Sequence, residues 1–355
     1  MKRFLTVIGM FLIGMLSLSG LTNIAHAIEY PLPPANSRLI GKNSTYIVPD
    51  DGRPLESIAA KYQIGLLAML EANPGVDPYL PKPGTELIIP SQMLLPDTVR
   101  QGIIINLAEL RLYYYPEGKN YVVVYPIGIG QLGRNTPTMT TSVSQLIKNP
   151  TWTPTVNIRK DYASRGIILP AVIPAGPDNP MGDFALRLAA GRGEYLIHGT
   201  NANFGIGMRV SSGCIRLRPD DIEALFQTVP RGTRVQVINE PMKYAIEPDG
   251  KRYVEVHQPL SNKETDDPQI MPIPRSEGLV KFINNRETDE FRVDQAIIRR
   301  SGMPVQVNTG LATNSQAEKA ILGPIEDTEE TITPEIKPAK IPPLHQPGPI
   351  SQPET

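Results

Sequence analysis

Proline is the residue type that most constrains the fold of this chain. The 355 residues include 37 prolines. Proline fixes its own φ angle and removes a backbone donor, so it ends helices and is rare inside sheets. We therefore expect short strands, loops and brief helices instead of long helices. A chain of this length is also too long for one small core, which predicts about two to three domains.

The charge of the chain is balanced. Lys and Arg total 35, Asp and Glu total 36, and the formal net charge is -1. This composition gives no electrostatic case for a nucleic-acid partner.

The first 27 residues have the pattern of a secretory signal peptide. Lys2 and Arg3 give a basic start, Phe4–Leu21 is nearly all apolar, and Ala25–Ala27 fits the small-x-small cleavage pattern. We expect export and a mature chain that starts at Ile28. The alternative is an uncleaved membrane anchor, because the apolar run is close to the roughly 18 residues that span a bilayer. No cysteine follows the leader, which excludes a lipoprotein.

Cys214 is the only cysteine, and export makes it informative. A lone thiol in an oxidising compartment cannot form an internal disulfide and is open to oxidation, so a function should require it. The alternative is a buried, inert cysteine. A nucleophilic thiolate needs a nearby base or positive field. His198, sixteen residues earlier, is the candidate base, since a strand, a loop and a returning strand would bring the two together.

The other three histidines have less informative surroundings. His26 lies in the leader and His345 in a proline-rich tail. His257 lies in a charged stretch, where we expect a surface residue and not a ligand. One cysteine and one nearby histidine do not make a zinc site, so we expect neither a metal nor a cofactor.

The residues before Cys214 suggest a site for a tetrahedral intermediate. Gly213 allows close substrate approach and, with Cys214, would present backbone N–H groups to an oxyanion. Ser211 and Ser212 could assist, although serines in turns are usually turn formers.

Arg216 lies on the same side of a strand as Cys214 under a period of two, so it could bind a substrate carboxylate. A structural salt bridge from Arg216 to Asp220 or Asp221 is an equal alternative, because arginine also pairs with structural carboxylates.

Residues 44–90 form the first predicted domain, a compact βααβ unit. Its elements are strands at Thr45–Val48 and Leu87–Ile89 and helices at Leu55–Tyr62 and Leu66–Ala72. With the segments YIVPDDGRPLESIAAKYQI, LLAMLEANPGVDP and PKPGTELIIP, this order resembles a LysM domain. The resemblance implies binding to peptidoglycan glycan chains. Asp51–Leu55 replaces the usual Gly-Asp-Thr-Leu turn, and a spacer without a ligand remains the alternative.

Residues 99–239 form a second, mainly β domain. Its predicted strands are Ile103–Ile105, Leu110–Tyr115, Tyr121–Pro126, Tyr195–His198, Met208–Ser211 and Arg234–Ile238, with a helix at Asp220–Phe226. Gly128–Gly130 is expected in a glycine-rich hairpin and not in a phosphate loop. The long loops Asn149–Thr155 and Leu169–Gly182 are typical of loops that frame a binding site. Trp152, in the first loop, is expected in the core.

The motifs PIGIG, TPT, WTPT, NPMGDFALRL, YLIHGT and SSGCIRL resemble the L,D-transpeptidase (YkuD-like) catalytic domain. With the leader and the LysM-like unit, the whole order resembles the ErfK/YbiS/YcfS/YnhG group. The implied fold is an α+β multidomain protein with a YkuD-like β-sandwich. The resemblance implies that Cys214 is the nucleophile, that His198 is the general base and that the Gly199 carbonyl orients the imidazole. Many members have histidine where this chain has Ser212, which leaves His198 as the sole base.

The reaction that this resemblance implies has two acyl transfers in the periplasm. Cys214 attacks the third-position diaminopimelate of a tetrapeptide stem, D-alanine leaves, and a thioester remains. The acceptor amine is a lysine of an outer-membrane lipoprotein, slightly favoured by the overall resemblance, or another diaminopimelate, which gives a 3-3 cross-link. Water as acceptor would make the enzyme a carboxypeptidase.

Two other function classes fit the sequence less well. A cysteine hydrolase of the NlpC/P60 type would place its cysteine before its histidine, and here the order is reversed. A non-catalytic wall-binding protein would keep the LysM-like unit and lose the cysteine or the histidine, and both are present.

The C-terminal part is expected to be an appendage followed by a tail. Within residues 240–309, Pro241–Leu260 predicts a small β unit and Leu279–Arg300 a mixed or helical segment. Residues 310–355 contain no aromatic residue and many prolines and charges, which predicts disorder.

Overall fold

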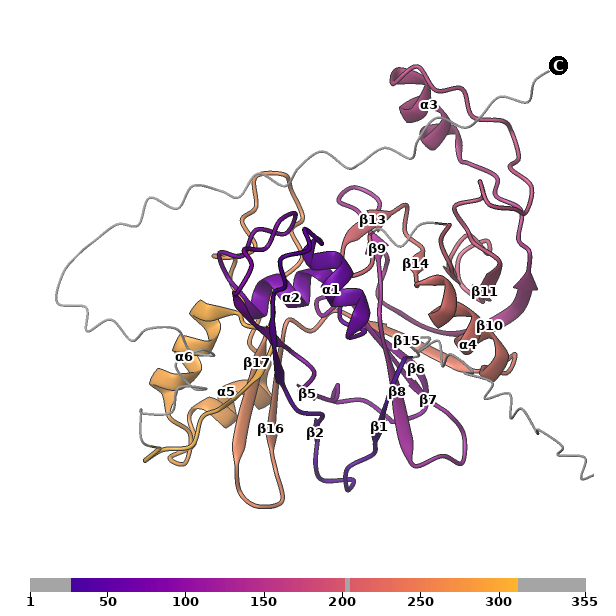
Figure 1. Ribbon diagram of the computed structural model, residues 1–355. Coiled ribbons are helices and arrows are strands. Elements are labelled where there is room, and N and C mark those ends of the chain that lie inside the picture. The colour runs from indigo at the N-terminus through magenta and orange to yellow at the C-terminus, as the bar shows by residue number, and fades with distance from the viewer. Residues whose placement is uncertain (1–26, 202–204, 312–355) are drawn as a thin grey trace, which may run out of the picture.

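The computed structural model describes residues 27–201 and 205–311 (Figure 1). The predicted leader, up to His26, and the predicted tail beyond Leu311 lie outside the described residues. None of the described helices has the length and hydrophobicity that a membrane span requires.

The LysM-like unit folds as predicted. Its elements are β3 (Ser44–Ile47), α1 (Leu55–Lys61), α2 (Leu66–Ala72) and β4 (Glu86–Ile89), and β3 pairs antiparallel with β4. A proline marks one end of each helix: Pro54 precedes α1, and Pro74 follows Asn73 at the end of α2. The Asn73 side chain then fastens the end of α2 to β4 through both backbone groups of Ile88, at 2.7 and 2.8 Å.

The catalytic part is built on a nine-stranded sheet with the order β1-β8-β7-β6-β15-β10-β11-β12-β14. The bounds are β1 (Ile28–Pro31), β6 (Gly102–Asn106), β7 (Arg111–Tyr115), β8 (Tyr121–Pro126), β10 (Met139–Lys148), β11 (Phe184–Leu188), β12 (Leu196–His198), β14 (Ile215–Arg216) and β15 (Arg234–Ile238).

Strand β10 turns the corner of this sheet. Its first half pairs with β15 and its second half with β11, with an irregularity between Val143 and Gln145. A bulge of this kind bends the strand, so the two halves of the sheet fold over the main apolar core, while the other face of β6, β7 and β8 lines a second apolar cluster. Helix α4 (Pro219–Thr228) packs against β11, with the rings of Phe184 and Phe226 4.9 Å apart. These features agree with the predicted mainly β catalytic domain.

The first described strand, β1, joins the edge of the catalytic sheet. It is extended and pairs antiparallel with β8 before the chain continues into the LysM-like unit. The strands β2 (Leu39–Ile40) and β5 (Met93–Leu94) pair with each other where the chain enters and leaves the LysM-like unit.

Two local predictions need correction, and one helix was not predicted. The segment Gly128–Gly130 does not form a hairpin, because β9 (Ile129–Gly130) pairs in parallel with β13 (Arg209–Ser211). Helix α3 (Val156–Ser164), which begins after a Thr155 cap, was not predicted. Trp152 is only half-buried and lies in a small satellite cluster beside Ile173, outside the main core.

The C-terminal part is a separate small domain. It consists of β16 (Met242–Ile246), β17 (Arg252–Val256), β18 (Pro304–Gln306), α5 (Glu277–Ile283) and α6 (Glu290–Arg299). The three strands form one antiparallel sheet, and both helices contribute apolar residues to its own core. This agrees with the predicted β unit followed by a helical segment.

The three parts meet at a group of six charged residues, which we call the buried charge cluster. It contains Glu71 of the LysM-like unit, Glu109 and Arg111 of the catalytic part, and Lys243, Glu255 and His257 of the C-terminal part. His257 is 1% exposed, so the prediction of a surface histidine is wrong. Its imidazole lies 3.0 Å from Glu71 and 2.8 Å from Glu255. The error arises because Glu71 is 186 positions away in sequence.

Candidate active site

The pairing of β12 with β14 brings the candidate nucleophile and base to one face of the sheet. The two strands run in parallel, with Ile197 opposite Ile215 and His198 opposite Arg216. Both isoleucines are fully buried in the main core. Side chains alternate between the faces of a strand, so His198 and Arg216 point away from that core, and the two-residue period places Cys214 on the same face. Cys214 and His198 are therefore diagonal neighbours across this strand pair.

The His198 ring is held by backbone carbonyls. It is 4% exposed, and Nδ1 lies 2.6 Å from the Gly199 carbonyl oxygen. Because a carbonyl only accepts, Nδ1 carries the proton, and Nε2 is left as the basic nitrogen. Burial, assisted by the charge of Arg216, lowers the pKa of His198 to about 4, against the carbonyls of Gly199 and Met181, which act to raise it. The imidazole is therefore neutral at pH 7.

The Cys214 thiol is partly exposed, and Sγ donates to the carbonyl of Glu194 at 3.4 Å. Burial raises the pKa of the Cys214 thiol above its ordinary value, while the Leu196 backbone and the Arg216 charge act to lower it. The resting thiol is therefore protonated at neutral pH, and thiolate formation requires a base.

The turn before the cysteine is fixed by side-chain hydroxyl groups. Gly213 has a φ of +109°, a conformation that favours glycine. Its N–H donates to Ser211 Oγ at 3.2 Å, and its carbonyl accepts from Thr136 Oγ1 at 2.9 Å. Ser211 Oγ in turn donates to the Cys214 carbonyl. The Gly213 amide is thus already engaged, unlike the free oxyanion donor that the sequence suggested.

Arginine side chains surround this turn. Arg134 donates to Ser212 Oγ at 3.2 Å, and Arg209 donates to Asn135 Oδ1 at 2.8 Å. Sequence reasoning assigned no role to Arg134, Thr136 or Arg209. The TPT motif, which contains Thr136, was the available signal. Together with Arg216, the two arginines bring three positive charges close to Cys214 in the chain fold, and arginine is suited to bind carboxylates.

The alternative salt bridge from Arg216 to Asp221 does not form. Both carboxylate oxygens of Asp221 lack a hydrogen-bond partner among the described residues, and so does Nε of Arg216. Burial raises the pKa of Asp221 to about 7, against the lowering effect of Arg218. The charge of Arg216 therefore remains available to the thiol, the imidazole and any anionic ligand.

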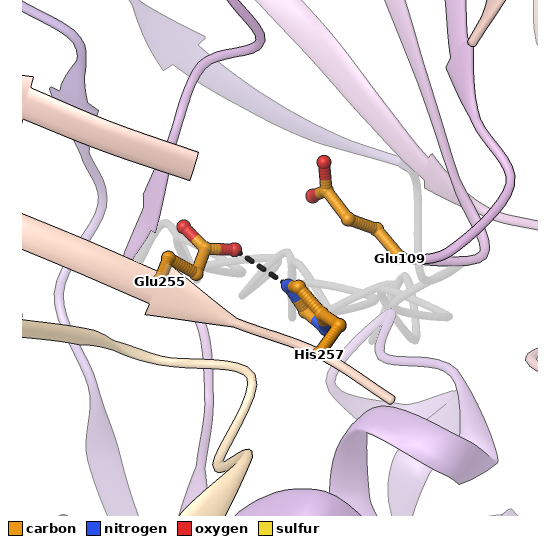
Figure 2. Close-up of side chains that lie close together, drawn as sticks. All are labelled: Glu109, Glu255 and His257. Atoms are coloured by element: carbon orange, nitrogen blue, oxygen red, sulfur yellow. Dashed lines mark hydrogen bonds and ion pairs between the residues drawn. The ribbon is translucent and has the colours of Figure 1, made fainter. Parts of the chain in front are cut away.

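The buried charge cluster is the second group of chemically active side chains (Figure 2). Glu109, Glu255 and His257 offer ligand atoms that all lie within 4.8 Å of one another, a spacing that could hold a metal ion. However, the Lys243 ammonium lies 2.9 Å from Glu109 and 3.0 Å from Glu255, and Arg111 lies 3.0 and 2.9 Å from the same carboxylates. These cations already occupy the place of a metal, so the cluster acts as an ion-pair network.

Three family models match successive parts of the chain. A LysM domain matches residues 55–90, an L,D-transpeptidase catalytic domain (YkuD) matches residues 100–237, and an L,D-transpeptidase C-terminal domain matches residues 241–307. The resemblance found in the sequence motifs is confirmed.

Curated relatives match most of the chain. "Probable L,D-transpeptidase YcfS" of Escherichia coli (strain K12) is 61% identical over 285 residues, which are 80% of this chain and 89% of the relative. "Probable L,D-transpeptidase ErfK/SrfK" of the same strain is 57% identical, over 80% of this chain and 92% of the relative. "Probable L,D-transpeptidase YbiS" of that strain is 55% identical, over 81% and 95%. The chain therefore belongs to the L,D-transpeptidase family, in the group of YcfS, ErfK/SrfK and YbiS.

Proposed function

We propose that this L,D-transpeptidase acts on peptidoglycan in the periplasm, with Cys214 as nucleophile and His198 as proton acceptor and donor. The observation that carries the proposal is the placement of Cys214, His198 and Arg216 on one face of the β12–β14 pair. The LysM match supports a glycan substrate, and the charges of Arg134, Arg209 and Arg216 suit the carboxylates of peptide stems.

The first half-reaction forms a thioester. Nε2 of His198 accepts the proton of the Cys214 thiol, and the sulfur attacks the carbonyl carbon of the third-residue diaminopimelate. The resulting oxyanion is stabilised by the Cys214 amide and the nearby Arg216 charge. The bond to D-alanine then breaks as the imidazolium returns its proton to the departing amine. D-Alanine leaves, and the acyl group remains on sulfur.

The second half-reaction returns the free thiol. An acceptor amine attacks the thioester, His198 takes a proton from it, and the thiolate leaves and is protonated. The two acceptors considered are a lipoprotein lysine, which the family resemblance favours, and a second diaminopimelate, which gives a 3-3 cross-link. Gly199 holds the imidazole in the tautomer that this proton shuttle needs.

Export through the predicted leader is compatible with the folded domain. Cleavage after Ala27 leaves Ile28, the first residue of β1, paired with Val124 of β8. Removal of the leader therefore leaves every strand of the sheet in place.

Mass spectrometry of the protein with a disaccharide-tetrapeptide tests the mechanism. We expect a covalent adduct on the Cys214 peptide and release of one D-alanine, and Cys214→Ala should bind sacculi without forming the adduct. An adduct on another residue, or none on the wild type, would refute the assignment. Adding a lipoprotein peptide with a terminal lysine, or excess tetrapeptide, identifies the acceptor, and release of free tripeptide instead would indicate water.

A further inference from the structure

We propose that the LysM module positions the catalytic strands as well as binding glycan, and that Glu56 is a positioning residue for the reaction. The inference rests on the proposed function, because it concerns the geometry of the same cysteine and histidine. The module contacts the chain on both sides of the cysteine strand (Figure 1). One contact is with Gly205–Gly207, which lies between β12 and β13, and the other is with Arg218, which follows β14.

The contact with Gly205–Gly207 uses backbone groups and one carboxylate. The hydrogen bonds are Leu66 N–H to the Ile206 carbonyl at 3.3 Å, Leu67 N–H to the Gly207 carbonyl at 3.2 Å, and Gly205 N–H to Glu56 Oε1 at 3.1 Å. The first amides of a helix have no acceptor within the helix, so α2 gains partners by docking here. The Glu56 carboxylate adds a charge-assisted bond, which is stronger than a neutral one.

The backbones approach so closely that only glycine fits at two facing positions. A Cβ on Gly65 would lie 2.9 Å from the Gly207 Cα. A Cβ on Gly207 would overlap the backbone of Gly65 and Leu66, and its φ of +78° also favours glycine. The interface is therefore shaped for one docked arrangement of the module.

The second contact fixes the other side of the cysteine strand. Arg218, buried at the start of α4, donates to Gln63 Oε1 at 3.1 Å and to the Ile64 carbonyl at 2.9 Å. Both acceptors belong to the turn between α1 and α2. The module is therefore fastened to the chain both before and after Cys214.

Backbone hydrogen bonds continue from the docked segment to the cysteine strand. They run from Gly207 N–H to the Ile127 carbonyl at 2.9 Å, from Ile129 N–H to the Met208 carbonyl at 3.0 Å, and between Gly128 and Arg216 in both directions at 2.8 Å. Arg216 pairs with His198 and lies two residues after Cys214. A displacement of about 1 Å at reacting groups can lower a rate by roughly 10²-fold, so loosening this chain of contacts should slow the chemistry.

The test measures thioester formation in the full chain with a soluble disaccharide-tetrapeptide, in single turnover. We expect Glu56→Ala and Gly65→Ala to lower the rate constant at saturating substrate by about 10–100-fold, with the half-saturating concentration changed by less than about twofold. Glu56→Gln keeps an acceptor for the Gly205 amide and should restore most of the rate. Glu86→Ala is the matched control: Glu86 is an exposed carboxylate of the same module, on β4, so the rate should match the wild type.

The reaction amplitude separates positioning from stability. Variants that react at the wild-type rate with a smaller reacting fraction, or that change only the half-saturating concentration, would overturn the inference. If Gly65→Ala does not fold, the comparison of Glu56→Ala with Glu56→Gln decides. A wild-type protein that forms no thioester would refute the proposed function, whereas active variants beside an active wild type would refute only this inference.

Discussion

The two histidines among the described residues, His198 and His257, are both buried and have opposite protonation states. Burial disfavours the charged form of both. His198 faces backbone carbonyls and the cation Arg216, and its pKa falls to about 4. His257 lies between the carboxylates of Glu71 and Glu255, which overcome the effect of burial and raise its pKa to about 9. The surroundings, and not burial alone, decide that one imidazole is a neutral base and the other a structural cation.

The buried charge cluster explains why His257 stays protonated. Glu109 and Glu255 face Arg111 and Lys243, and protonated His257 faces Glu71 and Glu255 and completes the balance of charge. Removing one partner from a buried ion-pair network leaves an uncompensated charge in a medium of low dielectric. The two histidines can therefore be separated by experiment: one should control rate and the other stability.

The largest effect is expected from His198→Gln. Loss of a general base typically lowers the chemical step by about 10²–10⁴-fold. The rate of thioester formation on Cys214, followed by mass spectrometry, is the measurement. Thermal unfolding should show that the variant remains folded, because a neutral residue replaces a neutral imidazole. A variant with near wild-type rate would remove His198 from the mechanism.

The next largest effect is expected from His257→Gln. Breaking a buried ion-pair network by removing one partner costs about 3–5 kcal/mol, so the free energy of unfolding should fall by this order. Denaturant unfolding at pH 7 measures it. The folded fraction should still acylate at the wild-type rate. A variant that is as stable as the wild type would show that protonated His257 does not stabilise the buried charge cluster.

The pH dependence of stability provides the control for His257→Gln. A histidine with a raised pKa contributes stability that is fully present below its unfolded pKa of about 6.5 and is lost as pH rises through the folded value. For His257 this window runs from about 6.5 to about 9, with a slope of about 1.4 kcal/mol per pH unit. The slope should be present in the wild type and absent in His257→Gln.

Below pH 6.5 the stability profile is less diagnostic for His198. Its lowered pKa makes stability fall on acidification between about 6.5 and 4. The raised pKa of Asp221, at about 7, acts in the opposite direction over the same range, because the folded state then binds the extra proton. Activity is therefore the better measurement for His198.

The smallest effect is expected on the acid limb of the rate profile. Because the pKa of His198 is about 4, the rate of acylation should decline only near that pH and not near 6.5. Arg216 lowers this pKa, so Arg216→Met should move the limb upward, toward 6.5, by about one pH unit. The limb is measured from single-turnover rates over a range of about pH 3.5 to 7. A wild-type limb at 6.5 would contradict the lowering of the His198 pKa by burial and the Arg216 charge.

Local sequence patterns predicted most elements of the fold. Helix α2 and strand β15 have the predicted bounds, Leu66–Ala72 and Arg234–Ile238, because apolar periodicity and flanking prolines or glycines define them locally. The pairing of Gly128–Gly130 was not predictable in this way. Its parallel partner, β13, lies about 80 positions later, and parallel pairing has no turn signature in the sequence.

The candidate site also contains features that the local sequence predicted and features that it did not. The sequence around the sole cysteine indicated Cys214 as nucleophile, His198 as base and Arg216 as a fixed positive charge, because few side-chain types supply these groups. The engaged Gly213 amide and the contacts of Glu56 and Arg218 depend on how separate segments pack.

The sequence by itself determined which residues we propose to react, the order of the domains and the family, because these depend on residue identity and local pattern. Only the tertiary structure decided that His257 is a buried cation, that β1 closes one edge of the catalytic sheet and that the LysM module is fastened to the active-site strands. The physical reason is that pKa values, sheet edges and domain contacts depend on partners brought together by folding across long sequence separations.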